Sequence, residues 1–196
     1  MAGDELTPLA TLADWIEEAR RAGEREPDAM SLATSTAAGA PSVRVVYCRG
    51  IGEEGVVFFT NYESRKGLEI AANPLAAAVF HWGTLRRQVR LEGRVEKVSR
   101  EASDAYFHSR ARGSQIASSI SPQSRPVESL DALRAACDAL ESRLAGAEVP
   151  RPSHWGGYRL VPSAIELWTS GDHRLHDRVR YVRDSAGQWQ GTRLGP

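Results

Sequence analysis

A series of short apolar segments, joined by equally short turns, most constrains how this chain can fold. Apolar and polar residues alternate over residues 30–34 and 43–47, and an apolar run follows over 56–60. The connections at 38–41 and 50–55 carry glycine or proline and are too short for the crossover that parallel strands require. The pattern therefore predicts an antiparallel meander.

The rest of the chain divides between strands and helices. Further strands are expected over residues 75–82, 88–96, 158–168, 178–181 and 188–190, with an end or a bulge at Lys97–Val98. Apolar residues at helical spacing, together with capping residues, predict helices over residues 8–22, 64–72, 100–110 and 130–144. Residues 113–125 are rich in Ser and lack periodicity, so we expect a functional loop or a linker there. The whole pattern predicts one mainly β, barrel-like domain with attached helices (α+β) over residues 1–196.

Charge and cysteine content exclude several classes of protein. Lys plus Arg number 25 and Asp plus Glu number 25, a balance that argues against a strongly basic nucleic-acid surface. The longest apolar run, residues 75–80, is too short to cross a bilayer, and the N-terminus has no basic start before an apolar stretch. We therefore expect no membrane association, no secretory signal and a cytoplasmic location. Cys48 and Cys137 are too few for a disulfide framework and are expected to be buried as small apolar residues.

Two glycine and serine motifs need opposite interpretations. Gly50-x-Gly52-x-x-Gly55 matches a dinucleotide-binding string, but a strand follows it where that site needs a helix, so we interpret it as turn residues. Residues 61–67 combine a Ser, two adjacent cations and a helix start, an arrangement suited to a phosphate or merely to a solvated helix end.

A second candidate anion site lies in residues 106–115. Tyr106, Arg110 and Ser114 follow one another at spacings of four and can converge at a helix end. An exposed basic helix end is the alternative. Two phosphate sites in one small barrel would suit a phosphorylated cofactor beside a phosphorylated substrate.

The polar segment 172–178 contains two histidines, His173 and His176. No cluster of further ligands accompanies them, so we expect an anion or substrate role and no metal. A serine-hydrolase role is disfavoured because the chain has no G-x-S-x-G turn.

Longer motifs occur in a fixed order along the chain. They are Arg44–Arg49, Phe59–Asn61, Ser64–Lys66, Arg87–Val89, Tyr106–Arg110, Ser114–Ile116, Ser121–Ser124, Trp155–Gly157, Glu166–Trp168 and Arg174–Arg178. The set resembles the pyridoxine (pyridoxamine) 5′-phosphate oxidase family over nearly the whole chain, from about residue 9 to residue 196. The C-terminal segment of the family would occupy about residues 150–196.

The resemblance implies a homodimeric split β-barrel with FMN bound at the subunit interface. By motif match, the flavin contacts would fall on Arg44, Val45, Val46, Tyr47, Cys48, Arg49, Phe59, Thr60, Arg65, Lys66, Gln88, Gln123, Ser124, Trp168 and Arg178. FMN would carry the redox chemistry, so the protein needs only to position the reactants.

The resemblance also implies the reaction. Pyridoxine or pyridoxamine 5′-phosphate would be oxidised at C4′ to pyridoxal 5′-phosphate, with hydride passing to flavin N5 and O2 becoming H2O2. The substrate would contact Arg49, Tyr106, Arg110, Ser114, Arg174, Leu175 and His176. Arg174 and His176 would be the catalytic residues, holding the pyridine ring over the flavin.

Three departures from the family pattern lie on the substrate side. Arg49 stands where the family usually has Lys, and Ser119 where it usually has Trp. The chain begins close to its first helix, so we expect it to lack the basic, tyrosine-bearing arm of longer relatives. Phe59 replaces the usual Tyr on the flavin side.

Two alternatives remain beside the vitamin B6 oxidase. One is a related flavin-dependent oxidase acting on another substrate, such as a phenazine-type biosynthetic intermediate, which would not need the residues assigned to the substrate phosphate. The other is a flavin- or haem-binding split barrel without turnover, which the Arg174–His176 motif argues against.

Overall fold

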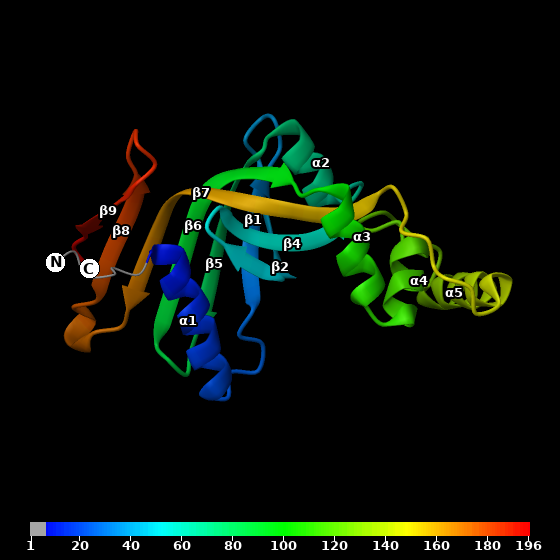
Figure 1. Ribbon diagram of the computed structural model, residues 1–196, viewed down its shortest axis with the longest axis horizontal. Helices are drawn as coiled ribbons and strands as arrows, with labels where there is room; N and C mark the ends of the chain where they lie inside the picture. The colour runs from blue at the N-terminus through cyan, green and yellow to red at the C-terminus, as the bar shows by residue number, and fades with distance from the viewer. Residues whose placement is uncertain (1–6) are drawn as a thin grey trace.

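The strands form one antiparallel sheet that curls into a half-barrel (Figure 1). The computed structural model describes residues 7–196, and in that range the sheet has nine strands. They are β1 (Ala29–Ser35), β2 (Pro41–Tyr47), β3 (Gly50–Gly52), β4 (Gly55–Asn61), β5 (Leu75–Trp82), β6 (Arg87–Lys97), β7 (Trp155–Thr169), β8 (Asp177–Arg183) and β9 (Trp189–Arg193). Their order is β2-β1-β5-β6-β7-β4-β3, with β8 pairing with the far end of β7 and β9 pairing with β8.

The predicted antiparallel meander is confirmed, with one refinement at its second turn. The segment expected as a turn over residues 50–55 contains the short strand β3, which pairs with β4 and leaves only Glu53 and Glu54 between them. Gly55 has a φ of +146°, and a Cβ there would lie 2.0 Å from the carbonyl oxygen of Leu160. Only glycine therefore lets β4 begin this close to β7.

β6 ends at Lys97, as predicted, but its irregularity lies elsewhere. The pairing register between β6 and β7 shifts between Glu92 and Gly93, opposite Pro162. Proline has no N–H to give to the ladder, and a Cβ at position 93 would lie 2.1 Å from the carbonyl oxygen of Val161. The bulge therefore arises from the partner strand, which the alternation within residues 88–96 does not reveal.

The helices lie against the sheet or extend beyond it (Figure 1). They are α1 (Pro8–Arg21), α2 (Arg65–Ala72), α3 (Arg100–Ser109), α4 (Arg112–Ile120), α5 (Leu130–Leu144) and the 3-10 turn η1 (Asp172–Arg174). In α1, Thr7 accepts a hydrogen bond from the N–H of Ala10 and Pro8 occupies the first turn, as predicted.

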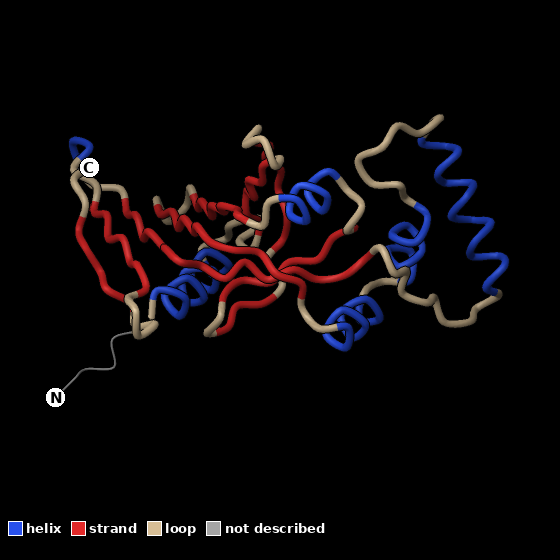
Figure 2. The backbone as a smooth tube through the Cα atoms, turned by 90° about the horizontal axis from the view of Figure 1, so that it is seen from above, coloured by secondary structure: helices blue, strands red, loops and turns tan. Residues whose placement is uncertain are grey.

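The interpretation of residues 113–125 as a loop or linker is wrong for its first half, which is α4. This helix buries Gln115 and Ile116 against a second apolar core containing Phe107 and Leu140. Its stability depends on that tertiary packing, because a helix of only nine residues is marginal in isolation. Figure 2 shows α5 and its flanking loops extending away from the sheet at this end.

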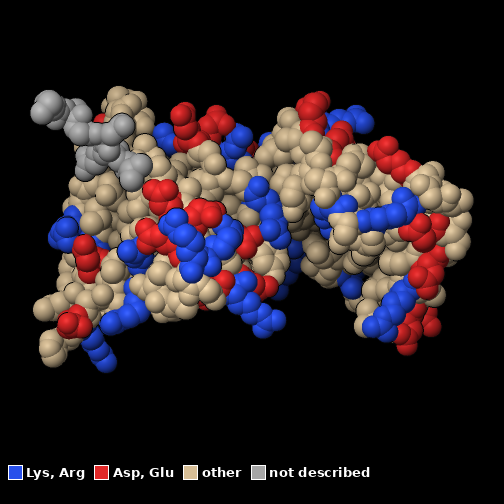
Figure 3. All heavy atoms as spheres, turned by 60° about the horizontal axis from the view of Figure 1, so that its bottom comes forward, with Lys and Arg blue, Asp and Glu red and all other residues tan. Residues whose placement is uncertain are grey.

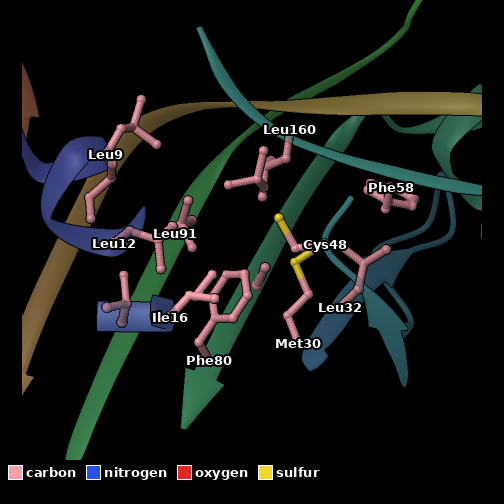
Figure 4. Packing of buried hydrophobic residues seen from close by; sticks show 14 of the residues in the cluster. Leu9, Leu12, Ile16, Met30, Leu32, Cys48, Phe58, Phe80, Leu91 and Leu160 are labelled. Carbon is pink, nitrogen blue, oxygen red and sulfur yellow. The ribbon is translucent and has the colours of Figure 1, made fainter. Parts of the chain in front are cut away.

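The larger core fills the space between the sheet and α1. Figure 4 shows Met30 and Cys48 lying near Leu32, with Leu9, Leu12 and Ile16 approaching from α1. Burial raises the pKa of the Cys48 thiol, in agreement with its predicted apolar role. Cys137, expected to be buried, is only half-buried.

One face of the molecule is mixed in charge (Figure 3), and the described helices are not of the membrane-spanning kind. Acidic and basic side chains are intermingled on the face seen in Figure 3. Within residues 7–196, every helix is too short or too polar to span a bilayer. The predictions about the N-terminus, that it carries no secretory signal and lacks the basic arm of longer relatives, concern residues 1–6, which lie outside the described residues.

Candidate active site

A cavity of about 300 Å³ lies where the end of β2, β4, α2, α3 and the start of β7 approach one another. Its lining comprises Val45, Val46, Tyr47, Arg49, Phe59, Thr60, Lys66, Tyr106, Arg110, Ser118, Gln123 and Trp155. All but Ser118 and Trp155 were predicted as site residues from the sequence. Both candidate anion sites, on α2 and at the end of α3, therefore contribute to one cavity.

Lys66 is the most deeply buried cation of this cavity. Its Nζ donates hydrogen bonds to Thr60 Oγ1 at 3.0 Å, Gln123 Oε1 at 2.9 Å and Ser64 Oγ at 3.4 Å, all neutral oxygens. Burial, with a smaller effect of Arg44, lowers the pKa of Lys66 to about 8. A cation with only neutral partners is a favourable place for an anion.

The start of α2 places Lys66 there. Ser64 caps the helix by accepting the N–H of Gly67 at 3.3 Å. A Cβ on Gly67 would lie 2.1 Å from the carbonyl oxygen of Tyr62, so the first turn can close against the preceding loop only with glycine at this position.

Arg44 and Arg65, predicted to contact the flavin, both form ion pairs with Glu69 beside the cavity. Arg65 Nε lies 2.9 Å and Arg44 NH2 lies 3.3 Å from this carboxylate, which also accepts bonds from Ser42 and Thr34. Burial alone would raise the pKa of Glu69, but these hydrogen bonds outweigh it and lower the pKa to about 2. Glu69 therefore compensates the two arginines.

Three aromatic rings form one wall of the cavity. Phe59 stacks on Tyr106 with centroids 3.9 Å apart and lies nearly parallel to Trp155 at 5.6 Å. Gly157, which pairs with Phe59 across β4 and β7, leaves room for that ring, because a Cβ there would lie 2.7 Å from Phe59 Cε1. Nearly parallel aromatic rings of this kind can stack with a further planar ring system.

Arg110 projects from the end of α3 toward this wall. Its Cζ lies 4.7 Å from the Trp155 ring centroid, and its NH1 donates to Ser118 Oγ at 2.9 Å. Burial lowers the pKa of Arg110, and the positive charge of Arg49 adds to this effect. Arg49 and Arg110 line the same cavity, so both are available to one anion bound there.

Ser118 and Trp155 are site residues that sequence reasoning missed. Trp155 belongs to a quoted motif but received no role. Ser118 lies one helical turn after the predicted Ser114, which is exposed and does not line the cavity. Recognising α4 as a helix would have indicated Ser118.

Several other predicted residues gather at the other end of the sheet. Gln88, Trp168 and Arg178 are neighbours in register across β6, β7 and β8. His176 lies 4.7 Å from Trp168 between ring centroids and accepts the N–H of Gly171 at its Nδ1.

The turn that follows β7 carries Arg174 and Leu175, both of them exposed. Arg174 and His173 have φ values of +66° and +53°, an uncommon backbone conformation for side chains of this size. Strained backbone of this kind is often found at functional sites.

Two further predicted residues lie outside the cavity lining. Cys48 is buried behind it, and Ser124 is exposed with a φ of +70° beside Gln123. Among residues 7–196, no three His, Cys, Asp or Glu side chains are grouped so that they could hold a metal ion.

The two clusters are far apart within one chain. β7 runs from the region of α3 to β8 (Figure 1). Trp155 at its start lines the cavity, whereas Trp168 near its end belongs to the second cluster. Thirteen residues of strand correspond to roughly 40 Å. One small ligand cannot contact both clusters of the same chain.

Comparison with known proteins identifies the family. Residues 16–143 match the family described as pyridoxamine 5′-phosphate oxidase, and residues 155–196 match the pyridoxine 5′-phosphate oxidase C-terminal dimerisation region. The chain is 50% identical over 196 residues to a pyridoxine/pyridoxamine 5′-phosphate oxidase of Cupriavidus pinatubonensis, covering all of this chain and 91% of that protein. A relative of the same name in Cupriavidus necator is 51% identical, with 96% and 89% covered.

Solved structures agree with this assignment. PhzG from Burkholderia lata, in complex with tetrahydrophenazine-1-carboxylic acid, superposes with a TM-score of 0.93 at 34% identity, covering 99% of this chain and 95% of that one. A pyridoxamine 5′-phosphate oxidase-related, FMN-binding protein of Nostoc punctiforme shares the fold, with a TM-score of 0.79 at 17% identity over 98% and 100% of the two chains. The predicted split-barrel fold is confirmed, and the chain belongs to the pyridoxamine 5′-phosphate oxidase family of enzymes.

Proposed function

We propose that this chain is an FMN-dependent oxidase that converts pyridoxine 5′-phosphate or pyridoxamine 5′-phosphate to pyridoxal 5′-phosphate, with O2 as acceptor and H2O2 as product. The observation that carries the proposal is the single cavity that combines the buried Lys66 with Arg49, Arg110 and an aromatic wall. The cavity thus offers cations for two phosphates beside a surface for planar rings.

The residues of the cavity fit FMN. Lys66 would hold the flavin phosphate, with Thr60 and Gln123 keeping its ammonium in place. Among residues 7–196, β2 is an edge strand that pairs only with β1, so backbone groups of Val45 and Val46 are available to the polar edge of the flavin. When bound, FMN supplies the two-electron oxidation of the substrate and passes the electrons to O2.

The chain's own residues then bind and orient the substrate. Arg49 and Arg110 would hold its phosphate, and Tyr106 would close the wall beside it. Arg174 and His176 would hold the pyridine ring so that C4′ faces the flavin, a positioning role that requires no further acid or base.

A second copy of the chain would complete the site. The cluster around Trp168 and His176 lies too far along β7 to reach the cavity of its own chain. The match of residues 155–196 to a dimerisation region supports a homodimer in which each cavity receives Arg174 and His176 from the partner. FMN would then lie at the interface.

The experiment is direct turnover. We expect the purified protein, loaded with FMN, to form pyridoxal 5′-phosphate and H2O2 in equal amounts when pyridoxine 5′-phosphate is added in air. A flavin-loaded protein that forms neither product would refute the proposal.

The likeness to PhzG supports a second candidate, oxidation of a reduced phenazine carboxylate. The higher identity to the vitamin B6 oxidases and the pair Arg49 and Arg110, suited to a dianionic phosphate, favour the first function. Rates with pyridoxine 5′-phosphate and with tetrahydrophenazine-1-carboxylic acid, measured side by side, distinguish the two.

A further inference from the structure

Two acidic residues in the connection between α1 and β1 hold the end of β2. Tyr47 donates its hydroxyl to Glu26 Oε1 at 2.5 Å, and Arg49 NH1 donates to Asp28 Oδ2 at 2.6 Å. The backbone joins them too, because the N–H of Cys48 donates to the carbonyl of Asp28 at 2.8 Å. The segment 26–28 and the end of β2 therefore form one unit.

Arg49 lies between two cavities. It lines the candidate active site, and it also lines a neighbouring cavity of about 440 Å³ between α1 and β3. Asp28 lines only the second of these. The Asp28 carboxylate thus contacts Arg49 on the side of the second cavity, facing away from the active-site cavity.

The guanidinium of Arg49 is held on two sides. NH1 is engaged by Asp28, and Cζ lies 4.6 Å from the centroid of the Tyr47 ring. Within residues 7–196, its only side-chain hydrogen bond is the one to Asp28, so its other N–H groups remain available. A planar guanidinium can donate to one anion through one nitrogen and to a second anion through its other nitrogens.

We propose that Asp28 is a positioning residue for the phosphate of the substrate, acting through Arg49. By fixing NH1, it orients the remaining N–H groups of Arg49 toward the anion that Arg49 and Arg110 share. The inference rests on the proposed function, since it takes the anion between these two arginines to be the substrate's phosphate.

Asp28 has two opposing effects on that phosphate. Its negative charge repels the anion, but its carboxylate stands on the far side of Arg49, and both side chains are partly exposed to solvent, which screens the repulsion. Against this, an arginine that is already ordered loses little conformational freedom when the anion binds. We expect the ordering to dominate.

The test measures binding to the FMN-loaded protein by calorimetry. The probe is 4-deoxypyridoxine 5′-phosphate, which has no C4′ hydroxyl or amine to oxidise. We expect Asp28→Asn to weaken its binding about fivefold, and to have an effect of less than about twofold when Arg49 is already Ala. Unphosphorylated 4-deoxypyridoxine should bind wild type and Asp28→Asn equally.

Glu18→Gln is the matched control. Glu18 Oε2 lies 2.5 Å from Arg87 NH1, and Arg87 Cζ lies 4.6 Å from the Trp15 ring, the same arrangement at residues that do not line the active-site cavity. This variant should bind the probe like wild type. Flavin content and Tm, measured on every variant, should remain close to the wild-type values.

Several outcomes would overturn the inference. Tighter binding to Asp28→Asn would mean that repulsion dominates, and an equal loss with and without Arg49 would mean that Asp28 acts on the fold. Loss of FMN rather than of the probe would mean that Arg49 serves the flavin. Turnover of pyridoxine 5′-phosphate by wild type is scored separately, so a failure of the proposed function would be recognised independently of the binding result.

Discussion

Nζ of Lys66 lies 2.9 Å from Oε1 of Gln123, a residue 57 positions later in the chain. The contact joins α2 to the segment that follows α4 and closes one side of the cavity. Since Thr60 and Gln123 offer only neutral oxygens, the cation is positioned without being neutralised. This arrangement is the basis of the first predictions.

Replacing Lys66 with Met should weaken FMN binding more than it weakens the fold. A hydrogen bond to a charged group contributes about 1.5–3 kcal/mol, so the FMN Kd should rise roughly ten- to a hundredfold. Stability of the FMN-free protein should change little, because the variant no longer has to bury a cation. Flavin fluorescence titration and thermal unfolding measure the two effects.

Lys97→Met is the matched control for this variant. Lys97 Nζ lies 4.1 Å from the Tyr62 ring centroid, outside the active-site cavity. FMN affinity should be unchanged by this substitution. An equal loss in both variants would show that general surface charge, rather than Lys66, attracts the flavin phosphate.

FMN affinity should also fall as the pH rises through about 8. Burial lowers the pKa of Lys66 from 10.5 to about 8, so the FMN-free protein loses this charge well below the ordinary range. Titrations between pH 7 and pH 9.5 should show the FMN Kd increasing in wild type and remaining flat in Lys66→Met. The same change of FMN Kd with pH in both proteins would contradict the assignment of Lys66 to the flavin phosphate.

Stability should respond to this pH change in the opposite direction. The unfolded chain keeps the Lys66 proton up to about 10.5, whereas the folded FMN-free chain releases it near 8. Between these values the unfolded state binds more protons, so this group makes the protein more stable as the pH rises. Below pH 8 its buried charge destabilises the fold, which explains why Lys66→Met should be tolerated.

Most of the fold could be predicted because its determinants are local. Strand alternation, the Thr7 cap and Pro8 all act within a few residues. α4 could not be predicted, because its helical state depends on Phe107 and Leu140 packing against Ile116. The bulge at Gly93 likewise depends on Pro162, 69 positions away in the sequence.

Most residues that line the candidate site could be predicted from the sequence, but the separation of the predicted residues into distinct groups could not. Motifs identified most of the cavity lining, but they could not show that Arg44 and Arg65 face Glu69, which lies 25 positions from Arg44. Nor could they separate Trp168 and its neighbours from the cavity. That separation follows from the length of β7.

Arg110→Ala should affect the substrate rather than the flavin. Its guanidinium shares the cavity with Arg49 and bonds to Ser118, away from the Lys66 contacts. We expect the KM for pyridoxine 5′-phosphate to rise about tenfold or more, with FMN affinity within about twofold of wild type. Steady-state kinetics at saturating FMN and a flavin titration measure both. Loss of FMN instead would show that the two anion sites are assigned the wrong way round.

Glu69→Gln should destabilise the protein by about 2 kcal/mol, because it leaves Arg44 and Arg65 without their shared counter-charge. The matched control is Glu54→Gln, which breaks an exposed ion pair with Arg159 and should cost less than about 0.5 kcal/mol. Urea unfolding measures both. Similar costs would show that the Glu69 cluster is not a stabilising centre.

Glu69 should also govern part of the acid unfolding. Its pKa is lowered from 4.5 to about 2, so its stabilisation is complete above pH 4.5 and is lost as the pH falls toward 2. Glu69→Gln, already lacking this contribution, should lose less stability than wild type over that range. Unfolding free energies at pH 6, 4 and 3 measure the difference, and parallel losses in the two proteins would contradict it.

A mixture of two inactive variants should recover activity if each cavity is completed by the partner. Lys66→Met disables the cavity and Arg174→Ala, an exposed change, disables the distant cluster. Refolding the two together gives mixed dimers in half of the molecules, each with one intact site. About a quarter of wild-type activity should therefore return when FMN is limited to concentrations that saturate only intact sites. Mixing Lys66→Met with Arg110→Ala, which alter the same cavity, should recover no activity beyond that of the Arg110→Ala sites themselves. No recovery in the first mixture would place Arg174 and Lys66 in the site of one chain, and equal recovery in both mixtures would show that the activity does not come from sites completed by the partner.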